Sequence, residues 1–180
     1  MTIIAAAEDK SGYWIGSDSH GIVHNISVEL GPKLIKKEKY VIGFSNSYRV
    51  RDIITENKHF PKTIGSTTSL RKFRDVLKEA MVNDGCMPVG MDGDTVLHPV
   101  SLVIISHNGI YTIDCDYQMH KAKQYTTIGA GSDVALGALR ATLNISKSGA
   151  EAVKQAVEAA IFHSTKCSGN IHIEHIPRKR

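Results

Sequence analysis

The stretch that decides the fold is residues 2–18, TIIAAAEDKSGYWIGSD. Two apolar runs, residues 3–7 and 13–16, flank a short polar turn. Apolar runs of this length bounded by turn residues predict the two strands of a hairpin, which we place at residues 2–8 and 12–18. Both runs are more continuous than simple alternation, so we expect other layers to cover both faces of the hairpin.

The rest of the chain predicts further antiparallel strands and two pairs of helices. Further strands are expected at 32–37, 40–44, 100–106, 110–114, 117–119, 125–128 and 170–176, and helices at 47–57, 69–82, 132–143 and 148–163. Residues 19–30 lack a regular pattern, and residues 85–98 indicate a loop or an irregular hairpin. Asn108-Gly109 between two apolar runs favours a type I′ turn. Helices that arrive in pairs suggest one helical layer per pair, outside two packed sheets, in an α+β fold.

Length and composition describe one domain, residues 1–180, of an ordinary globular kind. The chain has 180 residues, a net charge of +4, and no apolar run near the ~18 residues that span a bilayer. Three widely spaced cysteines and an N-terminus without a basic segment predict a cytoplasmic protein without membrane segments. The basic runs at 33–39 and 178–180 are a weak pointer to nucleic acid, and a solvated surface is the preferred interpretation.

Thr2 is the first residue that could carry chemistry. A threonine hydroxyl needs an adjacent base, and removal of Met1 would make the α-amine of Thr2 that base, with an ordinary pKa of about 7.7–8.0. Hairpin pairing would place Asp18, at the end of the second strand, near Thr2. Lys33 is flanked by apolar residues in the next predicted strand, and a lysine beside the hydroxyl would lower the cost of forming an alkoxide.

In their order along the chain, these features resemble those of a known family. The motifs are Thr2-Ile3-Ile4-Ala5, Gly16-Ser17-Asp18-Ser19, Lys33-Leu34-Ile35, Tyr40-Val41-Ile42-Gly43, Ile128-Gly129-Ala130-Gly131-Ser132 and Cys167-Ser168-Gly169-Asn170. They resemble the β-subunit of the proteasome, and most of all its bacterial relative, the peptidase subunit of the ATP-dependent two-component protease. These proteins are N-terminal nucleophile hydrolases.

The resemblance implies a four-layer αββα sandwich and hydrolysis of peptide bonds through an acyl-enzyme ester. Thr2 would be the nucleophile, and Asp18 and Lys33 the pair that tunes its charge. Ser47 falls where the family has a glycine whose N–H helps to form the oxyanion hole, and Ser168 would join the hydrogen bonds around the α-amine. The resemblance also implies a homo-oligomer, such as a ring, that acts on peptides or unfolded proteins, with an ATP-dependent unfoldase as a candidate partner.

Three departures favour an alternative, a catalytically inactive structural or binding subunit. Ala130 replaces the serine of a Gly-Ser-Gly motif, and Thr165 stands where the proteasome has an aspartate. The segment Ser45-Asn46-Ser47 replaces a turn richer in glycine. Met1 must also be removed for the threonine mechanism to operate.

Other motifs predict neither a cofactor nor a metal. Residues 129–131 resemble part of a dinucleotide fingerprint but lack the surrounding βαβ unit. Residues 92–94, Asp-Gly-Asp, lack the later ligands of a calcium loop and are expected to form a turn. His172 and His175 would point to opposite faces of one strand. Cys167 is a second possible nucleophile, although a small buried thiol is the commoner role of cysteine.

Overall fold

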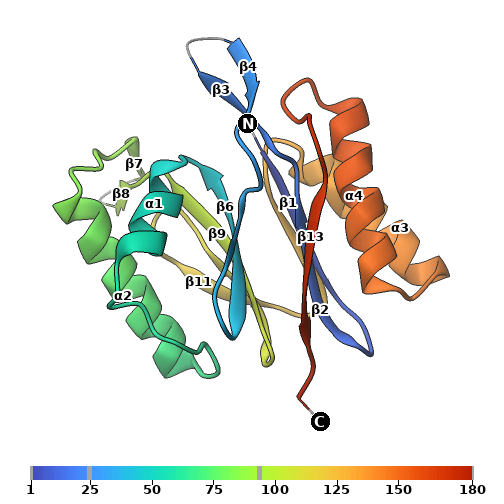
Figure 1. The fold of residues 1–180 in the computed structure, drawn as a ribbon, viewed down its shortest axis with the longest axis horizontal. Helices are drawn as coiled ribbons and strands as arrows, with labels where there is room; N and C mark the ends of the chain where they lie inside the picture. The colour runs from blue at the N-terminus through green and yellow to red at the C-terminus, as the bar shows by residue number, and fades with distance from the viewer. Residues whose placement is uncertain (1, 24–25, 93–94, 180) are drawn as a thin grey trace.

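The computed structural model describes residues 2–23, 26–92 and 95–179, which form four layers (Figure 1). Two antiparallel sheets pack face to face, with strand orders β12-β1-β2-β13 and β11-β10-β9-β6-β5. Helices α3 and α4 cover the first sheet, and α1 and α2 cover the second. The predicted α+β, four-layer αββα sandwich is therefore confirmed.

The strands and helices have the following bounds. The first sheet contains β1 (Ile3–Glu8), β2 (Gly12–Ser17), β12 (Tyr125–Gly129) and β13 (His172–Pro177). The second contains β5 (Leu34–Lys36), β6 (Tyr40–Asn46), β9 (Val100–Ser106), β10 (Gly109–Ile113) and β11 (Met119–Ala122). Two separate hairpins are β3 (His20–Val23) with β4 (Ile26–Glu29), and β7 (Gly90–Asp92) with β8 (Thr95–Leu97). The helices are α1 (Arg49–Glu56), α2 (Thr67–Asn83), α3 (Ser132–Ile145) and α4 (Gly149–His163).

Strand β1 shows why the layers form, because its two faces belong to different cores. Ile3, Ala5 and Ala7 pack against α3 and α4. Ile4 and Ala6 point the other way, into the core between the two sheets. Successive strand side chains alternate between faces, so a continuous apolar run is stable only when both faces are covered. This confirms the expectation for the opening hairpin.

The structure corrects several local predictions. Residues 19–30, expected to be irregular, form the β3–β4 hairpin, whose strands have only four residues each. The strand predicted at 117–119 begins at Met119, because Tyr117 has a φ of 64° and closes a turn with Asp114. The hairpin at Asn108-Gly109 is confirmed, but its type I′ turn is wrong: Gly109 pairs with Ser106, and Asn108 does not have the positive φ that this turn requires.

Helix starts follow local hydrogen bonds. Helix α1 begins at Arg49 rather than near residue 47, although the Ser47 hydroxyl does accept the Arg49 N–H. Helix α4 begins after Ser148, whose hydroxyl accepts the Glu151 N–H as predicted. The reciprocal half of that capping box is replaced by a hydrogen bond from the Ser148 N–H to Ser146.

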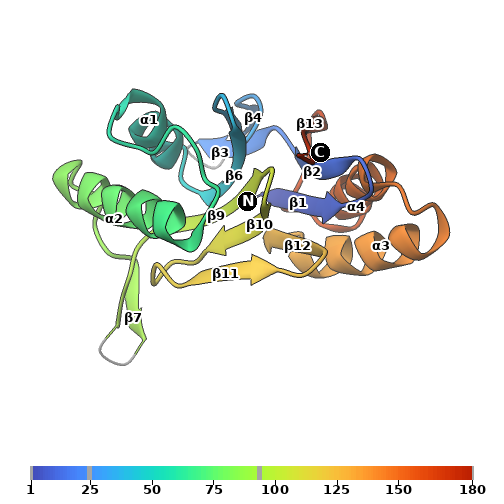
Figure 2. The same cartoon turned by 90° about the horizontal axis from the view of Figure 1, so that it is seen from below.

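The β7–β8 hairpin projects from the body beside α2 (Figure 2). Met87 and Val89, in the segment before this hairpin, and Met91, within β7, are exposed. Residues 93–94 of the predicted Asp-Gly-Asp turn lie outside the described part of the chain. Among the described residues, no helix combines the length and apolar character that a membrane span requires.

Candidate active site

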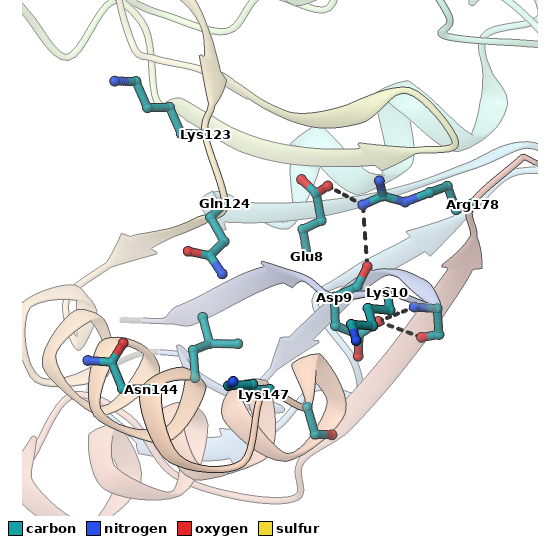
Figure 3. A pocket seen from close by; sticks show the side chains of 11 residues that line it. Glu8, Asp9, Lys10, Lys123, Gln124, Asn144, Lys147 and Arg178 are labelled. Atoms are coloured by element: carbon teal, nitrogen blue, oxygen red, sulfur yellow. Dashed lines mark hydrogen bonds and ion pairs between the residues drawn. The ribbon is translucent and has the colours of Figure 1, made fainter.

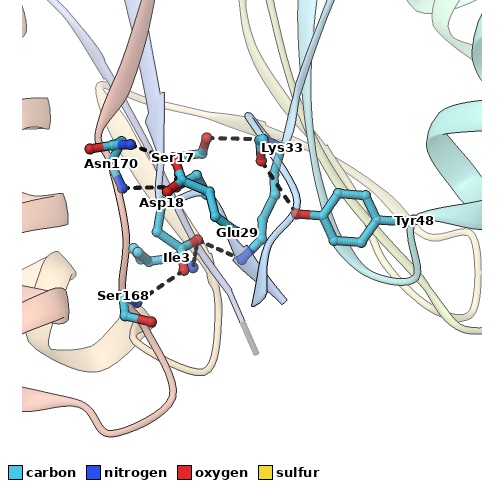
Figure 4. A network of polar contacts seen from close by, with 10 residues as sticks. Ile3, Ser17, Asp18, Glu29, Lys33, Tyr48, Ser168 and Asn170 are labelled. Atoms are coloured by element: carbon cyan, nitrogen blue, oxygen red, sulfur yellow. Dashed lines mark hydrogen bonds and ion pairs between the residues drawn. The ribbon is translucent and has the colours of Figure 1, made fainter. Parts of the chain in front are cut away.

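The Asp18 carboxylate is the centre of a buried polar network at one end of the first sheet (Figure 4). Its Oδ1 accepts hydrogen bonds from the Ile3 N–H at 3.1 Å and from Lys33 Nζ at 2.7 Å. Its Oδ2 accepts the Ser168 N–H at 3.4 Å. One side chain therefore connects the start of β1, the residue before β5 and the segment that precedes β13.

Lys33 and Asp18 form an ion pair that is almost completely removed from water, with side-chain exposures of 1% and 0%. Burial lowers the pKa of Lys33 below its ordinary value, although the hydrogen bond and the negative charge of Asp18 act in the opposite direction. The backbone of Lys33 is also fixed, because its N–H donates to the Ser17 hydroxyl and its carbonyl accepts the Phe44 N–H. A charge held this rigidly costs little to reorganise when a second charge forms beside it.

Thr2 is 4% exposed and immediately precedes β1, and the N–H of its neighbour Ile3 donates to Asp18 of this pair. Its carbonyl accepts the Gly131 N–H at 3.4 Å. Gly129, with a φ of 100°, passes so close that an added Cβ would lie 2.3 Å from the same carbonyl oxygen. An added Cβ at Gly131 would lie 2.8 Å from the side chains of Ala160 and Cys167. Gly129 therefore lets the end of β12 approach Thr2 closely. Gly131 lets the start of α3 approach Ala160 of α4 and Cys167.

A small pocket of about 110 Å³ opens beside Thr2. Its lining consists of Thr2, Gly21, Leu30, Phe44, Asn46, Ser47 and Tyr48. Burial, with a smaller contribution from the Asp18 charge, raises the pKa of Tyr48 to about 12, so this phenol is uncharged. The pocket thus combines the apolar side chains of Leu30 and Phe44 with polar groups of Thr2, Asn46 and Ser47.

Ser47 lines this pocket, but its N–H is engaged elsewhere. It donates to the Ser45 carbonyl at 3.2 Å across Asn46, which has a φ of 80°. Ser168 contributes its backbone N–H to the network, and its hydroxyl forms no hydrogen bond with any residue in the described part of the chain. All five predicted residues therefore gather at one end of the sandwich, whereas Ala130 and Thr165 are exposed.

A second set of polar contacts fixes the β3–β4 hairpin beside the pocket. The Ser19 hydroxyl donates to Glu29 and accepts the Asn170 N–H, and the Asn170 side chain also donates to Glu29. An added Cβ at Gly169 would lie 2.5 Å from atoms of both Ser19 and His20. The hairpin that carries Gly21 is thereby attached to the segment that carries Ser168.

Comparison with known proteins gives structural neighbours only. No family model and no curated protein sequence matches the chain. BPH from Thiobacillus denitrificans superposes with a TM-score of 0.82 at 13% identity, over 98% of this chain and 100% of that chain. The same protein in complex with epoxomicin gives 0.80 at 13% identity, over 97% and 98%. Eukaryotic HslV from Trypanosoma brucei gives 0.69 at 17% identity, over 98% and 99%.

The chain has the HslV-type fold. Its likeness to these structures extends over almost the whole chain, and at these identities it is a likeness of fold. The sequence-based prediction did not include Gly129, Gly131 or Ser17 among the residues of the site. Their contribution depends on contacts between distant segments, and the only local signal was a glycine at position 129, where φ is 100°. Among the described residues, no group of three or more potential ligands could hold a metal ion.

Proposed function

We propose that the protein is a threonine-type peptidase of the N-terminal nucleophile class, with Thr2 as its nucleophile once Met1 has been removed. The observation that supports this most is the buried Lys33–Asp18 pair beside Thr2. Removing two charges from water costs several kcal/mol per ion, so a buried pair that binds the residue next to Thr2 suits a chemical role.

In the proposed reaction, the α-amine of Thr2 takes the proton from the Thr2 hydroxyl as that oxygen attacks a peptide carbonyl carbon. The Lys33 ammonium stabilises the developing negative charge on the oxygen, and Asp18 keeps Lys33 charged and oriented. The peptide nitrogen leaves with a proton, and the acyl group remains on Thr2 as an ester. Water then hydrolyses the ester and regenerates the free hydroxyl.

Ser47 and Ser168 take supporting roles in this proposal. For the Ser47 N–H to stabilise an oxyanion, it must exchange its hydrogen bond to the Ser45 carbonyl for one to the substrate. Substrate binding would therefore include a local rearrangement at Asn46. The Ser168 N–H holds Asp18 from the other side.

Assembly into a homo-oligomer, peptides or unfolded proteins as substrates, and an ATP-dependent unfoldase as partner are further parts of the proposal. The HslV-type fold and the resemblance of the site motifs to the two-component protease support these parts. The alternative is an inactive structural or binding subunit. It is favoured by Ala130, which leaves no hydroxyl at that position, and by the Ser47 N–H being committed to Ser45.

The test begins with the N-terminus. We expect the intact mass of the purified protein to lack Met1, and Thr2→Ala to lower peptide hydrolysis by roughly 10⁴-fold or more, as loss of a nucleophile does. Thr2→Ser keeps a hydroxyl and should retain measurable activity. A covalent inhibitor directed at an N-terminal threonine should add to the wild type and Thr2→Ser but not to Thr2→Ala. Complete retention of Met1, or labelling that is unchanged in Thr2→Ala, would contradict the proposal.

The pocket beside Thr2 predicts which residue precedes the cleaved bond. At about 30 Å³ for each water-sized group, 110 Å³ admits three or four heavy atoms, as in valine or leucine. Peptide reporters with valine or leucine before the cleaved bond should have a kcat/KM about 10–200-fold higher than reporters with phenylalanine or arginine there. Gly21→Ala places a Cβ against Leu30 and Tyr48, so it should slow a leucine reporter more than an alanine reporter. An equal loss for both reporters would argue against this assignment.

A further inference from the structure

Far from Thr2, the opposite end of the sandwich concentrates positive charge. Five separate segments meet there: the β1–β2 turn, the β5–β6 turn, the β11–β12 turn, the α3–α4 connection and the tail after β13. We call the cations that they present the basic end face. It comprises Lys10, Lys39, Lys123, Lys147, Arg178 and Lys179.

Two adjoining concavities shape this face. The larger, of about 1180 Å³, is lined by Lys10, Lys123, Lys147 and Arg178 (Figure 3). The smaller, of about 410 Å³, is lined by Lys39, Arg178 and Lys179. Arg178 lines both, so the two concavities adjoin at this side chain and form one surface.

The acidic residues of the larger concavity are already satisfied within the protein. Glu8 forms an ion pair with Arg178. The Asp9 carboxylate accepts hydrogen bonds from the N–H groups of Ser11 and Gly12, and from Trp14 Nε1 and the Gly149 N–H. Its charge is therefore directed inward, to the turn and to the start of α4.

These hydrogen bonds also decide how Asp9 ionises. Burial acts to raise the pKa of Asp9, but the hydrogen bonds from Ser11, Gly149 and Gly12 together bring it below its ordinary value. The Asp9 carboxylate therefore remains ionised and hydrogen-bonded within the protein, so it does not compete with a ligand for the lysines. Glu38 is the remaining carboxylate on the face, in the smaller concavity.

The lysines of the basic end face, in contrast, are exposed. None of the five forms an ion pair with a residue in the described part of the chain. The local field is strong enough to affect a neighbour: burial lowers the pKa of His107, and the charges of Lys179 and Lys39 lower it further. Six cations face three carboxylates here, so this one end carries most of the chain's net charge of +4.

We propose that the basic end face binds a chain of phosphate groups. Lysine ammonium groups bind phosphate as compact point charges, and the one arginine of this face is already bound to Glu8. A phosphate chain offers a charge at every unit. An extended acidic peptide directs alternate side chains away from the surface, so it offers only half of its carboxylates. Among the described residues, neither concavity is lined by Phe, Tyr or Trp, and His107 is the one ring present, which favours recognition of the phosphates with little base stacking.

The experiment compares two sources of this chemistry, long-chain inorganic polyphosphate and a short DNA duplex, by fluorescence anisotropy between about 50 and 200 mM salt. The test variant is Lys10→Gln/Lys123→Gln/Lys147→Gln. The control is Lys78→Gln/Lys154→Gln/Lys166→Gln, which removes the same charge from exposed lysines of α2, α4 and the loop after α4. Circular dichroism checks that both variants are folded.

We expect the wild type to bind at least one of the two probes, with log affinity falling linearly against log salt. For DNA, the slope of log affinity against log salt should be smaller by about three in the test variant. Between about 50 and 200 mM salt, the wild type should therefore lose about 40-fold more affinity than the test variant. Binding of only one probe would assign the source of the phosphates. The proposal is overturned if neither probe binds, if the control loses as much affinity as the test variant, or if polyglutamate binds as tightly as the phosphate probes.

Discussion

Replacing Lys33 by methionine is expected to lower the free energy of unfolding by about 3–5 kcal/mol, because the Asp18 carboxylate would remain buried without its counter-charge. It is also expected to abolish peptide hydrolysis, since no cation would then stabilise the Thr2 oxygen. Urea unfolding followed by circular dichroism gives the first quantity, and a peptide reporter gives the second.

A double variant separates stability from chemistry. Asp18→Asn with Lys33→Met removes both charges while the amide oxygen of residue 18 can still accept the Ile3 N–H. We expect it to recover much of the lost stability but none of the activity. Recovery of activity along with stability would show that Lys33 serves the fold alone.

The matched control is Lys36→Met, which breaks the exposed ion pair with Glu174, where the side chains are 66% and 32% exposed. Exposed pairs of this kind contribute about 0–1 kcal/mol. If Lys33→Met proves no more costly than Lys36→Met, the account of a buried, rigid pair is wrong.

The second large effect is expected at Gly129. Gly129→Ala would force a side chain into a backbone conformation with a φ of 100° and place its Cβ 2.3 Å from the Thr2 carbonyl oxygen. The backbone strain costs about 1–3 kcal/mol and the steric overlap a similar amount, so we expect a loss of about 2–6 kcal/mol. Thermal and urea unfolding measure it directly.

Gly137→Ala is the control, because Gly137 lies in α3 with no heavy atom within 4 Å of an added Cβ. There the same substitution should stabilise the protein by about 0.5–1 kcal/mol, as alanine favours a helix over glycine. Opposite signs at two glycines only eight positions apart in sequence would show that proximity to Thr2, not glycine content, sets the cost. Equal effects at both positions would contradict the contact between β12 and Thr2.

The pairing of Asp18 with Lys33 could be anticipated because it depends on local information. Hairpin pairing returns Asp18 to the start of β1, and Lys33 follows within the next strand segment. The apolar runs of β1 and β2 likewise predicted two covered faces, since they combine strand length with continuous hydrophobicity.

Other features could not be read from the sequence because distant segments create them. The β3–β4 hairpin has short strands, and Asn170, far along the chain, binds its Ser19 and Glu29. The approach of Gly129 to Thr2 depends on the pairing of β1 with β12. The basic end face is a product of topology in the same way: its lysines belong to separate turns, and only the tail and the residues near 33–39 stood out as basic runs.

The burial of Thr2 sets a time limit on the maturation that the proposed mechanism requires. Ile3 pairs with both Asp18 and Gly129, so the start of β1 becomes enclosed once β12 has joined the sheet. An enzyme that removes Met1 must reach the bond between Met1 and Thr2, and we expect it to act before that moment. At about 5–20 residues per second of synthesis, the ribosome reaches Gly129 roughly 6–25 s after Thr2. Removal of Met1 and folding of the N-terminal strand would then compete while the chain is synthesised. The outcome, fixed once for each chain, would decide whether that chain becomes a hydrolase.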